Sequence, residues 1–167
     1  YRVSTVIDGY FSITDSNLPN LTSITTGGAR YNTFFGKNIA SNIGLGSEGN
    51  TAFGYKALNS INDKCDDNVA IGKEALRDLS SNNNSNGRNN IAIGSNSLQT
   101  AVNVIGNVAI GCKTLKSITS SSSANNVAIG SNALELGTTL SNAIMIGKEA
   151  GYNSNASNNI GIGNGVL

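Results

Sequence analysis

The chain has 167 residues, including 27 Asn, 21 Ser and 20 Gly, and only 13% of its residues are charged. A formal net charge of +1 gives no attraction to nucleic acid or an anionic membrane, and no apolar run approaches the roughly 18 residues of a membrane helix. Ile and Val recur at fixed places, whereas disordered chains are rich in charge and proline. We therefore expect an ordered chain with no nucleic-acid partner and no direct membrane insertion.

Residues 1–30 do not share the repetition that fills the rest of the chain. The stretch VSTVIDGYFSITDS (3–16) predicts one or two β-strands, and we interpret residues 1–30 as a capping or neck segment. The first residues lack the basic head, apolar stretch and cleavage site of a secretory leader. Because the chain neither starts with Met nor ends after a complete repeat, we expect it to be a piece of a longer protein.

Residues 31–167 repeat one short phrase, Asn-Val-Ala-Ile-Gly, with close variants. From Gly54 onward, the glycines that end the phrase are separated by 18, 22, 17, 19, 17 and 16 residues. Insertions are tolerated mainly in surface loops, so loops of variable length are expected between fixed elements. The sequence predicts a repeat domain over residues 31–167, with a unit of about 18 residues. The phrase-ending glycines are Gly36, Gly46, Gly54, Gly72, Gly94, Gly111, Gly130, Gly147 and Gly163.

Each phrase alternates in side-chain type with the period of a β-strand. Val127 and Ile129 share one face of such a strand, and Asn126, Ala128 and Gly130 share the other. We expect the Val and Ile face to point into the core, and the glycine to turn the chain at a corner that requires a positive φ. The face of small residues is expected to pack against other subunits. The aliphatic positions are Val69, Ile71, Ile91, Ile93, Val108, Ile110, Val127 and Ile129.

One such unit cannot bury its own apolar side chains, but units stacked on one another can. A small residue and Leu follow the glycine at a constant distance, as in Ala133-Leu134, and supply a second apolar position facing inward. Asn, Gly and β-branched residues are poor helix formers, so a helical repeat is disfavoured. The sequence predicts an all-β protein, a parallel β-solenoid or β-roll, whose thin core favours an oligomer. Aligned asparagines are expected to form an amide ladder at Asn68, Asn90, Asn107 and Asn126.

The repeated phrase resembles the head repeats of trimeric autotransporter adhesins, and it is similar to repeats in fibre proteins of phages and large viruses. Three segments carry the resemblance best: GNTAFGYKAL (49–58), NNIAIGSNSL (89–98) and NNVAIGSNAL (125–134). The resemblance covers residues 31–167. It implies a left-handed parallel β-roll, an interwound homotrimer and a role in attachment to surfaces.

The chain departs from that family pattern in three segments. The spacers over residues 77–89 and 116–125 are longer than in compact adhesin heads. The segment SNAIMIGKEAGYN (141–153) lacks the Asn-Val-Ala core and has Gly151 where Leu is expected. The long spacers favour a fibre-type protein over a bacterial adhesin.

Residues that could support catalysis are few. The absence of histidine removes Ser-His and Cys-His nucleophile systems and the commonest metal ligand, so we expect no enzyme and no cofactor. GLGSEG (44–49) matches a dinucleotide-binding glycine pattern but has no following helix or βαβ unit. The acidic segment DKCDDN (63–68) either holds Ca²⁺ through oxygen ligands or is a solvated loop. Cys65 and Cys112 stand at unmatched repeat positions, and we expect them to be unpaired.

Recognition is expected in the loops, because loops on a rigid scaffold commonly carry binding residues. The alternative is that these loops only cover the roll. Tyr31 and Tyr55 could stack on sugars, whereas Phe34, Phe35 and Phe53 are expected to fill the core. The candidate contact residues in the loops are Asp63, Asp66, Asp67, Asn84, Arg88, Ser121 and Ser122.

The sequence thus predicts a non-catalytic structural or attachment module of a trimeric fibre or surface adhesin. Its partners would be further copies of itself and a host-surface glycan or protein receptor, and its location would be a virion fibre or a bacterial cell surface. Two alternatives remain open. An ice-binding solenoid needs a row of matched Thr residues, but Thr33 and Thr51 are isolated in the phrase. A fibre-associated polysaccharide-degrading enzyme needs a defined carboxylate pair.

Overall fold

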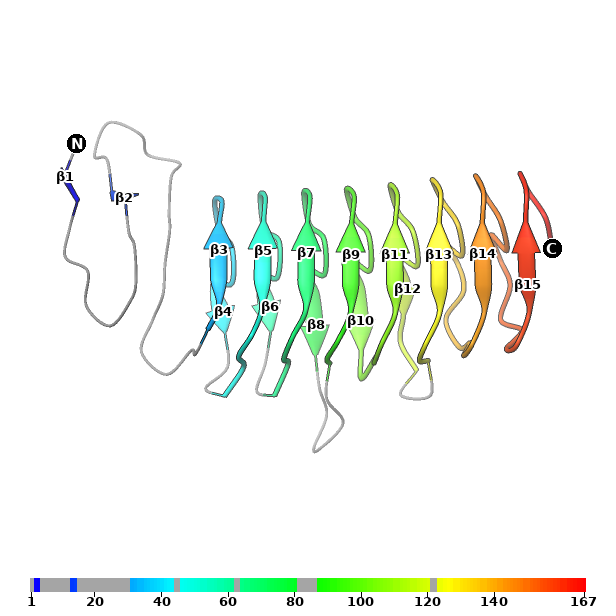
Figure 1. Ribbon diagram of the computed structural model, residues 1–167, viewed down its shortest axis with the longest axis horizontal. Coiled ribbons are helices and arrows are strands. Elements are labelled where there is room, and N and C mark those ends of the chain that lie inside the picture. The colour runs from blue at the N-terminus through cyan, green and yellow to red at the C-terminus, as the bar shows by residue number, and fades with distance from the viewer. Residues whose placement is uncertain are drawn as a thin grey trace.

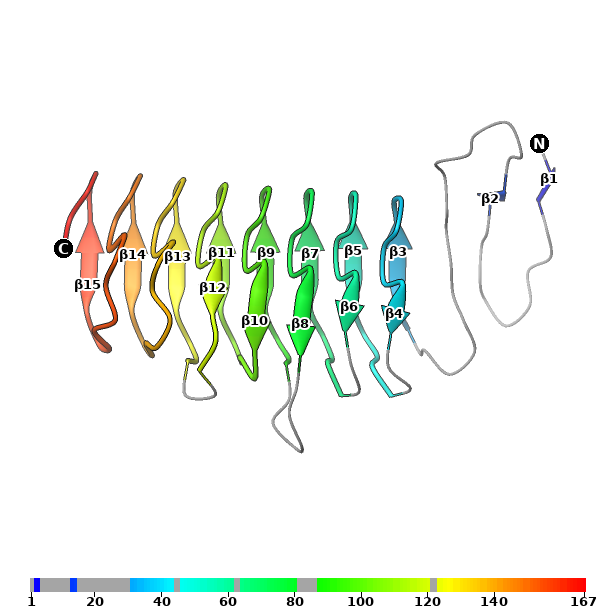
Figure 2. The same ribbon diagram turned by 180° about the vertical axis from the view of Figure 1, so that it is seen from behind.

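In a computed structural model, the repeat region is a parallel β-solenoid, as Figures 1 and 2 show from opposite sides. The structure describes residues 2–3, 13–14, 31–43, 46–61, 64–80, 87–120 and 123–167. Within these residues one parallel sheet has eight strands and a second has five. The larger sheet contains, in spatial order, β3 (Thr33–Phe35), β5 (Thr51–Phe53), β7 (Val69–Ile71), β9 (Ile91–Ile93), β11 (Val108–Ile110), β13 (Val127–Ile129), β14 (Ile144–Ile146) and β15 (Ile160–Ile162). The smaller contains β4 (Asn42–Ile43), β6 (Ser60–Ile61), β8 (Asp78–Ser80), β10 (Thr100–Val102) and β12 (Ser117–Ile118).

Near the N-terminus, β1 (Arg2–Val3) and β2 (Ile13–Thr14) pair antiparallel, which confirms the expected strands in this segment. The other residues of 1–30 lie outside the described residues, and the role of the segment as a cap or neck stays a prediction.

Successive phrases stack in register, so that each turn of the coil, or rung, lies on the equivalent residues of the previous rung. Thr33 pairs with Thr51, and Val69 pairs with Ile91 across the longest step. The repeat of about 18 residues is therefore confirmed. The phrase expected to end at Gly46 is not a rung, because β4 of the second sheet lies between β3 and β5.

The alternation within each strand is confirmed, but the two faces are the reverse of our expectation. Val127 and Ile129 lie on the outer surface, and Ala128 between them is fully buried. The space between the sheets is filled by other side chains, which leaves room for only a methyl group from the larger sheet. The expected packing of the alanine face against other subunits is therefore wrong. The inward alanines of the larger sheet are Ala52, Ala70, Ala92, Ala109 and Ala128.

The side chains that fill the interior come from the turns and from the second sheet. Leu134, which was expected to face inward, does so with no exposed surface. Its equivalents in the other turns are also fully buried: Leu58, Leu76, Leu98 and Leu115. The second sheet contributes Ile61, Leu79, Ala101 and Ile118.

The corner after each strand depends on glycine, as expected. Gly72 has a φ of 128°, and a Cβ there would lie 2.7 Å from the carbonyl oxygen of Gly94. Two further residues of the same turn, Glu74 and Leu76, have φ values of 57° and 47°. A left-handed conformation costs a non-glycine residue about 1–2 kcal/mol, and complete burial of a Leu side chain, worth about 1.5–3 kcal/mol, offsets that cost.

Buried asparagines of successive rungs form the expected amide ladder. Asn126 Nδ2 donates to Asn107 Oδ1 and to the carbonyl oxygen of Leu140, both at 2.9 Å. The backbone N–H of Asn126 donates to the same Asn107 oxygen at 3.0 Å. In the described part of the chain, no buried side-chain nitrogen or oxygen lacks a hydrogen-bond partner. The ladder consists of Asn50, Asn68, Asn90, Asn107 and Asn126.

The asparagine doublets of the sequence have a conformational cause. Asn125, directly before the ladder residue Asn126, has a φ of 56°, and Asn89 before Asn90 has a φ of 58°. Asn tolerates the left-handed region better than most residues because its short polar side chain bonds locally. In these two doublets, therefore, the first Asn turns the chain and the second bonds to the neighbouring rungs.

The atypical segment 141–153 contains a compensating exchange in the core. Met145 occupies the inward position that is Ala128 in the rung before it and Gly161 in the rung after it, and it is fully buried. Gly151 occupies the position of the inward Leu, and a Cβ there would lie 3.0 Å from Met145 Cγ and 3.1 Å from its Sδ. The Met side chain thus fills the volume that Leu fills in other rungs.

Candidate interaction surface

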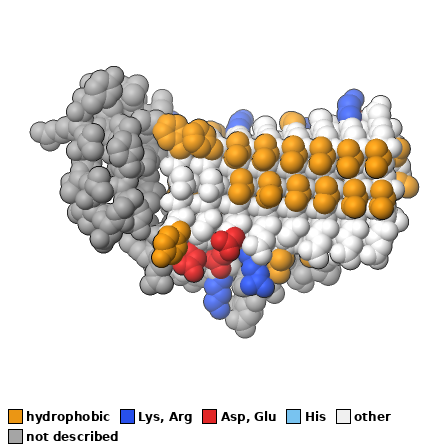
Figure 3. Space-filling view, in the orientation of Figure 1, with side chains coloured by type: hydrophobic (Ala, Val, Ile, Leu, Met, Phe, Trp, Pro, Cys, Tyr) orange, Lys and Arg blue, Asp and Glu red, His pale blue; other side chains and the backbone are white. Residues whose placement is uncertain are grey.

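The outward side chains of the larger sheet form two straight rows, whose hydrophobic members are visible as two orange lines in Figure 3. We call this surface the Val/Ile face. No member of either row is charged. The first row is Thr33, Thr51, Val69, Ile91, Val108, Val127, Ile144 and Ile160. The second row is Phe35, Phe53, Ile71, Ile93, Ile110, Ile129, Ile146 and Ile162.

The Val/Ile face is long and narrow. Eight strands at a spacing of about 4.8 Å span roughly 34 Å, and a strand of three residues is about 10 Å wide, giving a footprint of roughly 340 Å². The largest apolar patch on a typical single chain measures about 300–600 Å², and such a patch is often functional. Its β-branched side chains have few rotamers, so little side-chain entropy is lost when a partner covers them. Ile71 and Ile91, in the middle of the coil, are 41% and 36% exposed.

The outer surface of the second sheet has a different character. Its outward positions are mostly polar, whereas its inward positions are apolar and fully buried. Both sheets are parallel and alternate inward and outward side chains, so the difference in polarity comes from the residue types at the outward positions. The apolar surface is therefore a property of one sheet. The outward residues of the second sheet with described side chains are Asn42, Ser60, Asp78, Ser80, Thr100, Val102 and Ser117.

The aromatic residues at the first two rungs divide between core and surface. Phe34 is buried, as expected, because it occupies an inward position. Phe35 and Phe53 occupy outward positions and are 44% and 52% exposed, so the expectation that they fill the core is wrong. Their rings stack on each other, with centroids 4.8 Å apart and planes inclined by 23°.

The two candidate sugar-stacking residues are on the surface. Tyr31 is 87% exposed and Tyr55 is 40% exposed. The ammonium nitrogen of Lys56 lies 5.3 Å from the Tyr55 ring centroid, within range of a cation–π contact. Both rings are accessible, and their contact with a sugar stays a prediction.

The loop residues proposed for recognition are only partly described. Asp66 Oδ1 accepts a hydrogen bond from the backbone N–H of Glu48 at 3.1 Å. Asp67 and Arg88 are exposed, and the backbone of Arg88 bridges in parallel to Ile105. The backbone N–H of Asn89 donates to the carbonyl oxygen of Asp66 at 3.1 Å, so the segment that holds Arg88 stacks on the segment that holds Asp66 and Asp67. The remaining candidates, Asp63, Asn84, Ser121 and Ser122, lie outside the described residues.

Neither cysteine forms a disulfide, as expected: Cys65 is buried and Cys112 is exposed. Within the described ranges, no three His, Cys, Asp or Glu side chains come together as metal ligands. Because Asp63 lies outside those ranges, the calcium-loop hypothesis for residues 63–68 stays a prediction.

A charged cluster that sequence reasoning missed joins two rungs. Glu74 Oε2 accepts hydrogen bonds from Arg77 Nη1 at 2.8 Å and from Gln99 Nε2 at 2.6 Å. Burial raises the pKa of Glu74, but the hydrogen bonds from Arg77 and Gln99, with the charges of Arg77 and Lys73, outweigh burial and lower that pKa. Gln99 is 25 residues from Glu74 in sequence, so their contact follows only from the stacking of rungs. The Glu-x-x-Arg spacing was the available signal for half of the cluster.

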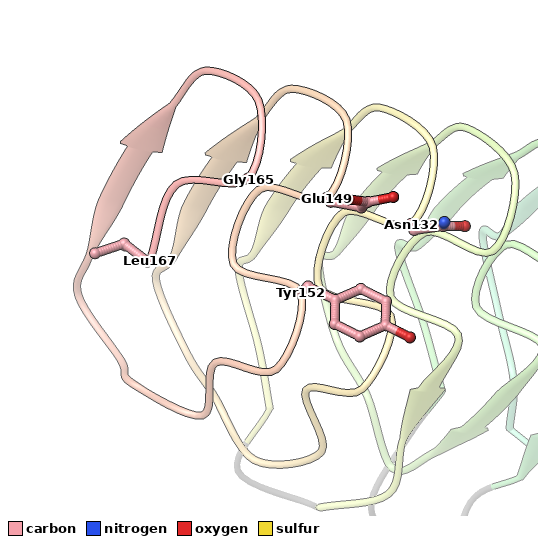
Figure 4. Close-up of a pocket in the computed structure, with 5 residues that line it drawn as sticks. All are labelled: Asn132, Glu149, Tyr152, Gly165 and Leu167. Carbon is pink, nitrogen blue, oxygen red and sulfur yellow. The ribbon is translucent and has the colours of Figure 1, made fainter.

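A shallow groove near the C-terminal end is lined by Asn132, Glu149, Tyr152, Gly165 and Leu167 (Figure 4). Asn132, Glu149 and Gly165 occupy the same left-handed turn position in successive rungs, with φ values of 59°, 58° and 62°. The groove therefore lies along the line of equivalent turns that runs the length of the coil. It brings no nucleophile and base together.

The chain matches no family model, no curated protein and no solved structure. The resemblance to adhesin heads accordingly rests on the repeated phrase alone. In the described part of the chain, no helix is long and apolar enough to cross a bilayer.

Proposed function

We propose that the chain is a non-catalytic structural and attachment module that assembles as an interwound, left-handed homotrimer through the Val/Ile face. The observation that carries this proposal is the pair of uncharged rows on the larger sheet, beside a mostly polar outer surface on the second sheet. An uncharged surface about 34 Å long is covered best by an equally uncharged surface of the same spacing. A second copy of the same chain supplies such a surface.

Two features favour three copies over two. Around a three-fold axis, each copy has two neighbours, so one row of the Val/Ile face can pack against each neighbour. The resemblance of the repeat to trimeric adhesin heads supports the same stoichiometry and the left-handed winding.

The variable segments fit a role in attachment. Residues 44–45, 62–63, 81–86 and 121–122 each follow a strand of the second sheet and precede the next strand of the larger sheet. In sequence, these four segments therefore recur between a strand of the second sheet and the next strand of the larger sheet. We propose that they contact a host-surface glycan or protein receptor, at a virion fibre or a bacterial cell surface.

Light scattering after size-exclusion chromatography tests the assembly. We expect three times the chain mass of 17.1 kDa. The variant Ile110→Lys/Ile129→Lys introduces charge into the Val/Ile face and is expected to dissociate the trimer. Its matched control, Ser60→Lys/Ser117→Lys, introduces the same charge on the outer surface of the second sheet and should leave the mass unchanged. A parent protein that elutes as a monomer contradicts the proposal.

The attachment role needs its own measurement. We expect the trimer to bind a subset of surface glycans or receptor proteins in an array screen. Removal of the variable residues 82–86 should weaken binding without changing the oligomeric mass. If the parent binds nothing in such screens while the trimer is intact, the role is structural only.

The ice-binding alternative makes a different prediction for the same face. Thr33 and Thr51 lie side by side in the first row, but the other members of that row are Val or Ile. A measurement of thermal hysteresis separates the two functions, and we expect none. The third hypothesis, a polysaccharide-degrading enzyme, predicts glycan cleavage that disappears when Asp63, Asp66 and Asp67 are replaced by Ala.

A further inference from the structure

The uniformity of the Val/Ile face creates a problem of alignment between copies. From β7 to β15, six successive rungs present nearly the same pair of aliphatic side chains. A copy displaced along the coil by one rung, about 4.8 Å, finds nearly the same surface opposite it. Register is weakly specified wherever successive positions are equivalent. The six aliphatic rungs therefore do not fix the axial alignment of copies.

Two rungs break this uniformity. Phe35 and Phe53 take the places that Ile occupies in the second row, next to Thr33 and Thr51 in the first. The two rings stack at 4.8 Å and remain about half exposed, so they stand outward as a rigid aromatic step at one end of the face. Phe is larger than Ile, and a neighbouring copy must accommodate that step.

We propose that the Phe35–Phe53 stack sets the axial register of the assembled copies. This inference rests on the assembly proposed above. In register, the aromatic rungs of all copies meet one another. After a slip of one rung, Phe35 of one copy still meets Phe53 of another, but Phe53 of the first copy lies opposite Ile71. One of the two aromatic contacts is lost, and a large side chain is forced against a closely packed aliphatic rung.

Disulfide trapping measures the register directly. Two chains with different affinity tags, one with Ile110→Cys and one with Ile129→Cys, are co-expressed in a Cys112→Ser background. These positions are one rung apart in the second row. A disulfide between two chains that carry the same substitution shows that equivalent rungs are aligned, and we call it a same-rung disulfide. A disulfide between a chain with Ile110→Cys and a chain with Ile129→Cys shows a slip of one rung, and we call it a cross-rung disulfide. For the parent face we expect same-rung disulfides to dominate.

The decisive variant is Phe35→Ile/Phe53→Ile, which makes the second row aliphatic throughout. We expect the ratio of same-rung to cross-rung disulfides to fall about tenfold, the factor that corresponds to about 1.4 kcal/mol. The matched control Ile71→Val/Ile93→Val trims two positions of the same row and should leave the ratio unchanged. A rescue variant adds Ile146→Phe/Ile162→Phe to the aliphatic chain and should restore same-rung disulfides.

The outcomes separate the two proposals. If the aliphatic variant keeps the parent ratio, or if the parent already forms both disulfides equally, the register inference is wrong and the assembly stands. If light scattering gives a monomer and no disulfide joins two chains, the assembly is wrong, and the register inference fails with it.

Discussion

The exchange of Met145 and Gly151 predicts a strong energetic coupling inside the core. Met145 is fully buried, and replacing a buried Met by Ala costs about 2–5 kcal/mol because a cavity remains. Gly151→Leu alone brings a Cβ within 3.0 Å of Met145 Cγ and 2.9 Å of Leu134 Cδ2, and overpacking of this kind costs about 1–3 kcal/mol. Each single substitution is therefore expected to lower the free energy of unfolding.

The double variant Met145→Ala/Gly151→Leu is expected to be more stable than the sum of the single effects. It recreates the pair Ala128 and Leu134 of the neighbouring rung, in which Leu has a φ of 53°. Gly151 has a φ of 61°, so the new Leu adopts a conformation that the other rungs already use. We expect a coupling energy of about 2 kcal/mol, within the range for residues in contact.

Recovery in the double variant is expected to be partial. A Cβ at Gly161 would lie 2.7 Å from Met145 Sδ, so the next rung also leaves space for the Met side chain. Urea unfolding followed by circular dichroism, at one fixed chain concentration, measures the four free energies. Strictly additive single effects in the double variant would refute the reasoning. Adding Gly161→Ala should then recover more stability if the cavity argument is correct.

Three further predictions concern other parts of the coil. Asn107→Ala removes a side chain that bonds to both neighbouring rungs. The change should cost about 2–4 kcal/mol, because the backbone N–H and the Nδ2 of Asn126 both lose their acceptor. Asn153→Ala in an exposed turn should change stability little in the same urea assay. The pKa of Glu74 is lowered in the folded state, so its ionised carboxylate stabilises the fold at pH values above its unfolded pKa of about 4.5. This stabilisation is lost as the pH falls through the folded pKa. The stability difference between the parent and Glu74→Gln should therefore shrink in acid, and a constant difference from pH 7 to pH 3 would contradict the ion-pair explanation. Cys112 is exposed and Cys65 is buried, so a thiol reagent should label one thiol per native chain and two after denaturation. Rapid labelling of both thiols in the native state would show that the coil opens near Cys65.

The repeat architecture was predictable because the spacing of the phrase carries it. Strand positions, parallel stacking, glycine corners and the asparagine ladder all follow from residues that recur at equivalent places. Alternation alone, however, defines two faces without stating which one is inside. That choice depends on the distance between the sheets, and this distance is set by the Leu residues of the turns and the large residues of the second sheet.

A signal for the correct choice was present in the sequence. The central Ala is constant from Ala52 to Ala128, whereas its neighbours vary among Thr, Val, Ile and Phe. A tightly packed interior tolerates little change in volume, and an outer surface tolerates more. The exposed Val/Ile face was missed for the same reason, since the Val and Ile residues were assigned to the core. The Glu74–Gln99 contact could not be predicted without knowing which spacer residues stack.

The stacking of equivalent residues also has a consequence for how such a chain can change over evolutionary time. In the described part of the coil, the backbone and amide hydrogen bonds between rungs join a rung to the rungs directly before and after it, as in the bonds between Asn107 and Asn126. Duplication or loss of one whole rung therefore creates or removes a single junction and leaves every other junction intact. The coil can lengthen or shorten in steps of about 4.8 Å without altering its cross-section.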